Sequence, residues 1–272
     1  METVRSADGT PIAYWRTGEG SPLLLVHGTT CDHTTWADVL PALERRFSVF
    51  TMDRRGRGQS GDNPAYAHQR ELEDIAAVIA AIAAAEGPVD VLGHSFGALC
   101  SLEATLLSKN VRRLILYEPP MAISGRDLPP EMERRMQFFI SAGKKEQALV
   151  LFLRDVLQIP AHELAAQHAS PGWPAIVATA HTVPRECKVV DGYTFDPERF
   201  RNMRTPTVLF VGSDSPEPQH DIAATVHAAL PDSRIVLLPG EQHFALNTAP
   251  DLFAYEVEAS LSADNAGATK VG

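Results

Sequence analysis

One pentapeptide of this sequence has the residue types and the spacing of a serine nucleophile. The run GHSFG at residues 93–97 follows the apolar stretch Val89–Leu92 and precedes the helical stretch Ala98–Leu107. Between a strand and a helix, G-x-S-x-G places its serine on a sharp turn, and the two glycines allow the close backbone approach that this turn needs. The pattern predicts that Ser95 is the nucleophile of an acyl-transfer reaction.

A serine hydroxyl needs a nearby base at neutral pH, and imidazole is the side chain that titrates in this range. The sequence holds ten histidines. His243 comes just after the last predicted strand, Ile235–Leu238, which puts it at the same edge of the sheet as the serine turn, so we expect it to be the general base. Histidines without a comparable position lie in predicted helices or connections: His162, His168, His181, His220 and His227.

The tripeptide His-Gly-Thr at residues 27–29 ends an earlier predicted strand, Leu23–Val26. At this position a backbone N–H can meet the N–H of the residue after the nucleophile, and together they can hold a developing oxyanion. We expect Thr29 and Phe96 to supply these two groups. His27 is interpreted as a structural residue of the turn.

Short apolar runs alternate with longer helical stretches, which is typical of a mostly parallel sheet covered by helices on both faces. The runs are Leu23–Val26, Phe47–Met52, Val89–Leu92, Val111–Tyr117, Thr207–Val211 and Ile235–Leu238. Residues 121–203 contain no convincing buried strand and are too long for an ordinary crossover connection. We therefore expect a core of residues 1–120 and 204–262, a helical cap inserted at 121–203, and a flexible tail at 263–272.

Large apolar side chains recur at helical spacing in the predicted cap. Met132, Met136 and Phe139 share one helical pattern, and Trp173 follows within a Pro-Gly-Trp-Pro break. Two interpretations stay open for them. They pack the cap onto the core, or they line a hydrophobic entrance and bind substrate.

The composition excludes several classes of protein. The formal net charge is -10 and the basic residues are scattered, so we expect no nucleic-acid partner. No stretch has the length of a membrane span and no signal peptide is evident, so we expect no membrane association. Cys31, Cys100 and Cys187 lack the spacing of a metal site or a disulfide framework, which favours a cytoplasmic protein without a bound metal.

Four motifs in this order resemble the α/β-hydrolase superfamily over nearly the whole chain. They are HGT at 27–29, DRRGRGQS at 53–60, GHSFG at 93–97 and LLPGEQHFAL at 237–246. The resemblance implies an α/β fold with a mostly parallel eight-stranded sheet flanked by helices, an inserted helical cap, and acyl transfer without a cofactor.

The third member of the expected triad departs from the superfamily's usual pattern. Most relatives place an acid three residues after the glycine that ends the penultimate strand, but this position is Ser215, and Asp214 comes one residue early. Glu118 ends the strand after the nucleophile helix, where some members carry their acid, so Glu118 is the leading candidate and Asp214 the alternative. The zearalenone-lactonase group is loosely similar in this feature and in the Thr-Val-Pro run at 182–184.

These residues together predict a serine hydrolase that cleaves a carboxylic ester or lactone of a small, mainly apolar substrate. Ser95 attacks the carbonyl, His243 takes the proton and Glu118 stabilises the imidazolium. A carbon–carbon bond hydrolase or lyase of the same fold, and a non-catalytic ligand receptor on a hydrolase scaffold, stay open as alternatives. The expected partner is the small-molecule substrate, and a homodimer is left open.

Overall fold

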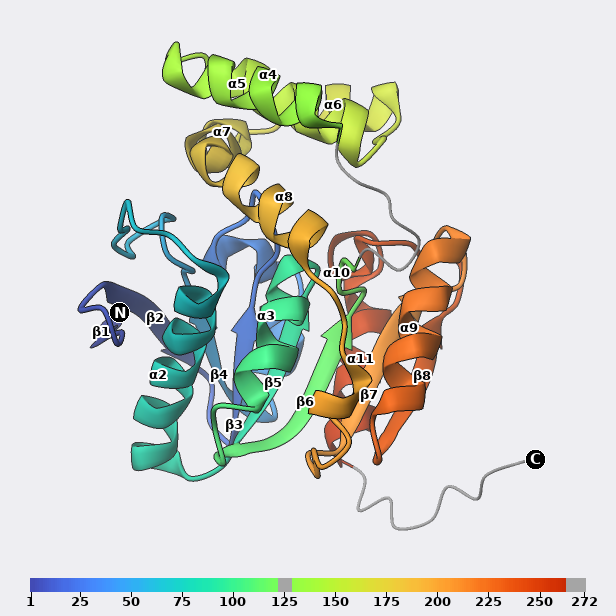
Figure 1. The fold of residues 1–272 in the computed structure, drawn as a ribbon. Coiled ribbons are helices and arrows are strands. Elements are labelled where there is room, and N and C mark those ends of the chain that lie inside the picture. Colours follow the sequence, from blue (N-terminus) through green and yellow to red (C-terminus); the bar gives the residue numbers. More distant parts are fainter. Residues whose placement is uncertain (122–128, 263–272) are drawn as a thin grey trace.

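An eight-stranded sheet forms the centre of the protein (Figure 1). The computed structural model describes residues 1–121 and 129–262. The strand order is β1-β2-β4-β3-β5-β6-β7-β8. The bounds are β1 Glu2–Arg5, β2 Pro11–Thr17, β3 Ser21–Val26, β4 Phe47–Met52, β5 Val89–His94, β6 Val111–Tyr117, β7 Thr207–Gly212 and β8 Ser233–Leu238.

The strand directions place the ends of β5, β6 and β7 side by side. β1 and β2 pair antiparallel, as do β2 and β4, and all the other pairings are parallel. The last residue of β5, His94, pairs with Tyr117 of β6, and Tyr117 pairs with Phe210 of β7. Since parallel strands end at one edge, the residues that follow these strands, Ser95 and Glu118 among them, gather at that edge.

Helices cover both faces of the sheet and bury two apolar cores (Figure 1). One core lies under α2 (His68–Glu86), α3 (Phe96–Thr105) and α9 (Glu217–Ala229). The other lies under α1 (Leu40–Leu43) and α11 (Pro250–Ser262). Neighbouring residues of a strand point to opposite faces, so a central strand such as β3 must be apolar throughout. Leu24 packs in the first core and Leu25 in the second.

A group of helices between β6 and β7 lies over the carboxyl edge of the sheet (Figure 1). Its elements are α4 Pro130–Ser141, α5 Lys145–Leu151, η2 Phe152–Val156, α6 Ala161–His168, α7 Trp173–Thr179, η3 Ala180–Thr182 and α8 Val183–Gly192. After α8 the chain runs to the other end of the sheet, where the short turn η4 (Pro197–Arg199) precedes β7. The helices of the group bury a third apolar cluster of their own. Phe244, which precedes α10 (Ala245–Thr248), packs against this cluster from the core side. We call this group the cap.

The predicted fold class is confirmed. All six strands expected from apolar runs are present with small shifts at their ends, and β1 and β2 complete the eight-stranded sheet. The expected tail at 263–272, and residues 122–128 of the expected cap, lie outside the described residues. Within the described ranges, no helix has both the length and the apolar character that crossing a bilayer requires.

Candidate active site

Ser95 lies on a tight turn between β5 and α3, where its backbone has φ 54° and ψ -127°. Residues other than glycine rarely adopt a positive φ, and such strain costs on the order of 1–3 kcal/mol. Gly93 and Gly97 make the turn possible. A Cβ on Gly97 would lie 2.4 Å from the carbonyl oxygen of His27, and a Cβ on Gly93 would lie 2.6 Å from Cα of Ala98. Close packing that only glycine permits therefore holds Ser95 at the sheet edge.

His243 and Glu118 meet at the same edge, although they are far apart in the sequence. His243 lies on the loop between β8 and α10, and Glu118 directly follows β6. Nδ1 of His243 and Oε2 of Glu118 are 2.6 Å apart. The Glu118 side chain is fully buried, and 26% of the His243 side chain is exposed. This hydrogen bond engages Nδ1 and leaves Nε2 as the ring nitrogen that can exchange a proton with a substrate or a nucleophile.

The surroundings of Glu118 keep its carboxyl group ionised. Oε1 accepts a hydrogen bond from the N–H of Gly212 at 2.9 Å and another from Oγ of Ser215 at 2.5 Å. Burial opposes the charge, but the hydrogen bond and charge of His243, together with Ser215 and Gly212, lower the pKa of Glu118. A buried carboxylate with three hydrogen bonds is suited to orient an imidazole and to stabilise its protonated form.

Asp214, the alternative acid, forms no hydrogen bond with His243 within the described part of the chain, where Nδ1 of His243 is bound to Glu118 instead. It is exposed, and its carboxylate accepts a hydrogen bond from Oγ of Ser213 at 2.9 Å. Ser215 occupies the position where most relatives carry the acid, and its hydroxyl donates to Glu118 instead. The structure thus brings Glu118, and not Asp214, to His243.

His94 connects the serine turn to the histidine loop. Its Nε2 lies 2.9 Å from the carbonyl oxygen of His243, and the two rings are 4.7 Å apart between centroids. Burial, and then the neighbouring His243, lower the pKa of His94 well below its ordinary value, so its ring is neutral and Nε2–H donates. Among the described residues, no hydrogen bond joins the Ser95 hydroxyl to the His243 ring. Catalytic hydrogen bonds of this kind commonly tighten only when substrate binds.

The two expected oxyanion donors flank Ser95. A Cβ on Gly28 would lie 2.9 Å from Cβ of Ser95, which places the turn at 27–29 directly against the nucleophile. Phe96 is the first residue of α3, where backbone N–H groups have no acceptor within the helix. In the described parts of the chain, neither the N–H of Thr29 nor that of Phe96 donates to a protein acceptor. N–H groups without a protein acceptor are what an oxyanion site requires.

His27 has a structural role in this turn. Its Nδ1 lies 2.9 Å from the carbonyl oxygen of Gly28, and its Nε2 lies 3.1 Å from the N–H of Arg54. Burial lowers the pKa of His27 well below its ordinary value, and the charge of Arg54 adds to this. The neutral ring therefore donates from Nδ1 and accepts at Nε2, which leaves no nitrogen for proton transfer.

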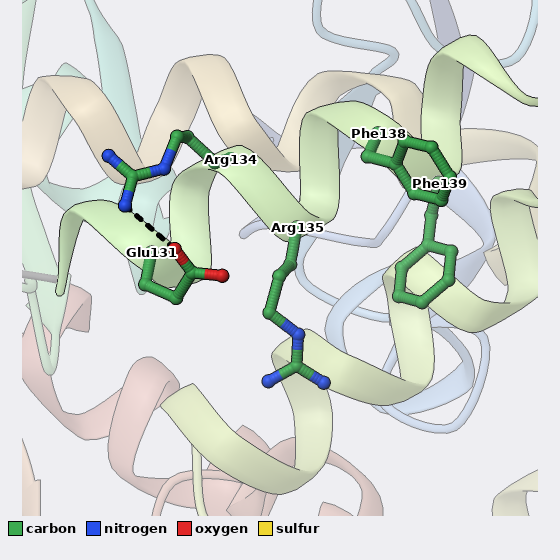
Figure 2. A pocket seen from close by; sticks show the side chains of 5 residues that line it. All are labelled: Glu131, Arg134, Arg135, Phe138 and Phe139. Carbon is green, nitrogen blue, oxygen red and sulfur yellow. Dashed lines mark hydrogen bonds and ion pairs between the residues drawn. The ribbon is translucent and has the colours of Figure 1, made fainter.

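The four cap residues considered as substrate-binding residues lie in the apolar cluster of the cap. Met136 and Trp173 are buried in it, and Met132 and Phe139 are half-buried against it. Phe139 also lines a groove of about 420 Å³ on α4. Figure 2 shows the other lining residues of this groove, which are Glu131, Arg134, Arg135 and Phe138. These positions show packing within the cap, and Met136 and Trp173 have almost no surface left for a ligand.

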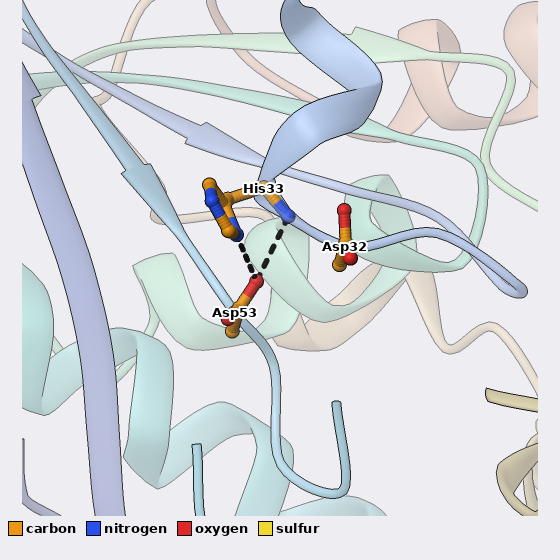
Figure 3. A group of neighbouring side chains, drawn as sticks. All are labelled: Asp32, His33 and Asp53. Carbon is orange, nitrogen blue, oxygen red and sulfur yellow. Dashed lines mark hydrogen bonds and ion pairs between the residues drawn. The ribbon is translucent and has the colours of Figure 1, made fainter. Parts of the chain in front are cut away.

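One group of side chains in the described residues has the composition of a metal site: Asp32, His33 and Asp53 (Figure 3). Three of the four carboxylate oxygens in this group already accept hydrogen bonds. Oδ1 of Asp53 accepts from the backbone N–H and Nδ1 of His33 at 2.9 and 2.7 Å, and Oδ2 accepts from the N–H of Gln59 at 2.8 Å. Asp32 accepts from the N–H of Thr34 at 2.9 Å and caps the helical turn η1 (His33–Trp36). The arrangement has the hydrogen bonds of a structural turn.

Sequence reasoning did not find two residues that hold the histidine loop, Tyr117 and His94. The hydroxyl of Tyr117 donates to the carbonyl of Gln242 and accepts from the N–H of Ala245 at 3.0 Å. His94 holds the carbonyl of His243 from the other strand. His94 and Tyr117 are the last residues of their strands and directly precede Ser95 and Glu118. This position beside the expected catalytic residues was the one feature of the sequence that could have indicated their role.

A turn-borne serine, a parallel sheet and an inserted group of helices define the α/β-hydrolase class of folds. The model of the alpha/beta hydrolase family matches residues 23–257, and the chain belongs to this family. A solved α/β hydrolase from Sphaerobacter thermophilus is similar with a TM-score of 0.84 and 35% identity, covering 95% of this chain and 99% of that chain.

Two curated relatives are also hydrolytic enzymes by name. The 2-hydroxy-6-oxo-6-(2'-aminophenyl)hexa-2,4-dienoic acid hydrolase of Metapseudomonas resinovorans is 24% identical over 93% of this chain and 88% of its own length. The N-formylmaleamate deformylase of Pseudomonas putida is 36% identical, but over 46% of this chain and 47% of its own length.

Proposed function

We propose that this protein is a serine hydrolase that cleaves a carboxylic ester or lactone through an acyl-enzyme. The observation that carries the proposal is the 2.6 Å hydrogen bond between His243 and Glu118 beside the strained turn of Ser95. A buried acid that orients a half-buried imidazole next to a partly exposed serine is the arrangement that activates a hydroxyl nucleophile.

In the first half-reaction, Oγ of Ser95 attacks the substrate carbonyl carbon while Nε2 of His243 takes the hydroxyl proton. The tetrahedral intermediate carries its negative charge on the former carbonyl oxygen, which accepts hydrogen bonds from the N–H groups of Thr29 and Phe96. His243 then gives the proton to the leaving oxygen, and the C–O bond breaks. Glu118 stabilises the transient imidazolium from Nδ1.

In the second half-reaction, water replaces the alcohol. His243 takes a proton from this water, the resulting hydroxide attacks the acyl carbon, and the same two N–H groups bind the second oxyanion. The proton returns to Oγ of Ser95 as the acid leaves. With a lactone the leaving alcohol stays attached to the acyl group, so one ring-opened hydroxy acid is the only product.

The substrate side of the proposal rests on the cap. Phe244 follows His243 directly and packs against the apolar cap cluster, so the base lies beneath an apolar surface. A small and mainly apolar ester or lactone fits this position better than a charged ligand.

A second candidate is hydrolysis of a carbon–carbon bond, which the same serine, histidine and oxyanion donors can support. The observation that favours it is the relative from Metapseudomonas resinovorans, whose named substrate is a dienoic acid with a ketone and no ester. Comparing turnover of a vinylogous keto acid with turnover of esters separates the two activities.

The decisive experiment is a panel of p-nitrophenyl esters and simple lactones, tested with the wild type and with Ser95→Ala. We expect turnover by the wild type, its loss in Ser95→Ala, and covalent labelling of Ser95 by a fluorophosphonate in the wild type alone. Ser101→Ala is the matched control, because Ser101 is a buried serine further along α3. Ligand binding without turnover, unchanged in Ser95→Ala, would contradict the proposal and favour a receptor.

A further inference from the structure

The direction of the Thr29 N–H is set from the opposite side of its peptide group. The carbonyl of Gly28 and the N–H of Thr29 belong to one peptide, which is planar and trans, so the two groups point in opposite directions. Nη1 of Arg54 donates to the Gly28 oxygen at 3.1 Å and to the His27 oxygen at 3.3 Å. A hydrogen bond that fixes the position of the Gly28 oxygen therefore also fixes the direction of the Thr29 N–H.

The same guanidinium contacts the residue that supplies the other donor. Cζ of Arg54 lies 4.7 Å from the centre of the Phe96 ring, in a cation–π contact. The backbone N–H of Arg54 donates to Nε2 of His27, so main chain and side chain bind the same turn. Arg54 thus binds the carbonyl of the peptide group that carries the Thr29 N–H, and it contacts the side chain of Phe96.

Arg54 is itself held by acids from the core and from the cap. Glu71 on α2 accepts hydrogen bonds from Nε and Nη2 of Arg54 at 3.1 and 3.0 Å. Glu186 on α8 accepts one from Nη2 at 2.6 Å. Arg57 also donates to Glu186, and it reaches Thr182 at 2.8 Å. Arg54, Glu71 and Glu186 are buried, with 0–1% of their side chains exposed. We call Arg54, Arg57, Glu71 and Glu186 the buried charge cluster.

The charges in this cluster are fixed by one another. Burial opposes the charge of Arg54, but Glu186 and Glu71 raise its pKa well above the ordinary value. Burial also opposes the charge of Glu186, and Arg54 and Arg57 lower its pKa. Two cations and two anions at fixed positions behind the oxyanion turn form a preorganised electrostatic environment, and only one of them, Glu186, comes from the cap.

We propose that Arg54 is a positioning residue that aims the oxyanion donor of Thr29, and that Glu186 makes this alignment depend on the docked position of cap helix α8. The inference rests on the proposed function, because it assumes that the Thr29 N–H binds an oxyanion. It adds a residue outside the triad and a physical link between the cap and the reaction.

The test compares Arg54→Lys with Arg55→Lys. Lysine keeps the charge but lacks the planar fork of donors that reaches two carbonyls and two carboxylates at once. Arg55 is the matched control, because it is equally buried, is bound by Asp74 and Asp8, and makes no contact with Thr29 or Phe96 among the described residues. Both variants remove a comparable set of buried ion-pair contacts.

We expect Arg54→Lys to lower kcat about 10- to 100-fold with KM nearly unchanged, since removing an oxyanion donor outright costs about 100- to 1,000-fold. Affinity for a trifluoromethyl ketone, whose adduct places an oxyanion in the same site, falls in parallel. Arg55→Lys lowers Tm but keeps kcat and this affinity. Equal kcat values in the two lysine variants would overturn the inference.

Glu186→Gln keeps the test decisive if Arg54→Lys does not fold. It retains the size and an acceptor for Arg54 but removes the charge, and we expect a smaller drop in kcat with a matching loss of trifluoromethyl ketone affinity. Unchanged values in a folded Glu186→Gln would overturn the link to the cap. The proposed function fails separately, if the wild type neither hydrolyses esters nor reacts with the fluorophosphonate at Ser95. The comparison of the two lysine variants tests only the role of Arg54.

Discussion

Glu118 reaches His243 from the end of β6, whereas Asp214 stays in solvent after β7, so one pair of variants separates the two candidate acids. Glu118→Gln keeps the shape of the side chain but no longer selects the productive imidazole tautomer. We expect it to lower kcat by about 1,000- to 10,000-fold, as loss of the orienting acid does in serine hydrolases with a Ser-His-Asp triad. Steady-state kinetics on a p-nitrophenyl ester measure this. Asp214→Asn, the control, keeps kcat, and the reverse pattern would contradict the assignment.

The carboxyl group of Glu118 also makes stability depend on pH. Burial opposes ionisation, but His243, Ser215 and the Gly212 N–H lower the pKa below the ordinary value of about 4.3. A lowered folded-state pKa adds to the free energy of unfolding above that ordinary value, and the contribution is lost as the pH falls through the folded-state pKa. We expect the Tm difference between wild type and Glu118→Gln to be largest near pH 7 and to shrink below about pH 4. Thermal unfolding across this range tests it, and a difference that grows toward acid would contradict it.

Positions at strand ends explain which site residues the sequence could indicate. Ser95, Glu118 and His243 follow predicted strands, so their types and addresses were visible in the sequence and the structure brings them to one edge. Ser215 and Arg54 were not found as site residues, because their roles depend on which atom of a neighbouring loop faces them. Such contacts follow from tertiary packing and leave no periodic signal.

The turn between β5 and α3 depends on the space that Gly97 leaves. A Cβ there would lie 2.4 Å from the carbonyl oxygens of Val26 and His27, which belong to backbone that cannot move independently. We expect Gly97→Ala to abolish folding or to lower Tm strongly. Gly172→Ala is the control, because its added Cβ would have Ser170 Oγ, at 3.8 Å, as its nearest neighbour, so we expect an equal or slightly higher Tm. A Gly97→Ala protein with wild-type Tm would show that the contact is not rigid.

The cap helix α4 buries Met136 completely and leaves 63% of Phe138 exposed. Met136→Ala should therefore lower the free energy of unfolding by about 2–5 kcal/mol and leave KM unchanged, because truncation opens a cavity in the cap cluster. Phe138→Ala, on the same helix, should stay within about 0.5 kcal/mol of the wild type. Urea unfolding and ester kinetics measure both quantities. A raised KM without lost stability would instead identify Met136 as a substrate contact.

Burial explains why some elements could be predicted and others could not. β4 is buried along its whole length, and its uninterrupted run of apolar and small residues was found with the correct ends. β1, with the sequence ETVR, is an exposed edge strand, so nothing in it requires apolar residues. Its strand conformation comes from antiparallel pairing with β2, which is a non-local cause.

At the scale of the whole molecule, the sequence predicted a core and an inserted helical segment but contained no sign of how tightly the two are joined. In the structure, ion pairs join the cap to the core. Glu186 on α8 pairs with Arg54 and Arg57, and Arg185 pairs with Asp62 of the core at 2.9 Å. Separating the two parts would leave buried charges without partners, which costs several kcal/mol for each one that stays buried.

This coupling predicts that cap and core unfold together. Trp36 lies in a core cluster and Trp173 in the cap cluster, so each reports on its own part of the molecule. Two variants each keep a single tryptophan, Trp36 in one and Trp173 in the other, with the remaining tryptophans replaced by Phe. We expect both to give the same urea midpoint by fluorescence, because unfolding of either part would leave buried charges without partners in the other. Circular dichroism of both proteins checks that the replacements are neutral. If the Trp173 signal changes at a clearly lower urea concentration, the cap unfolds as a separate unit and the ionic junction is weak.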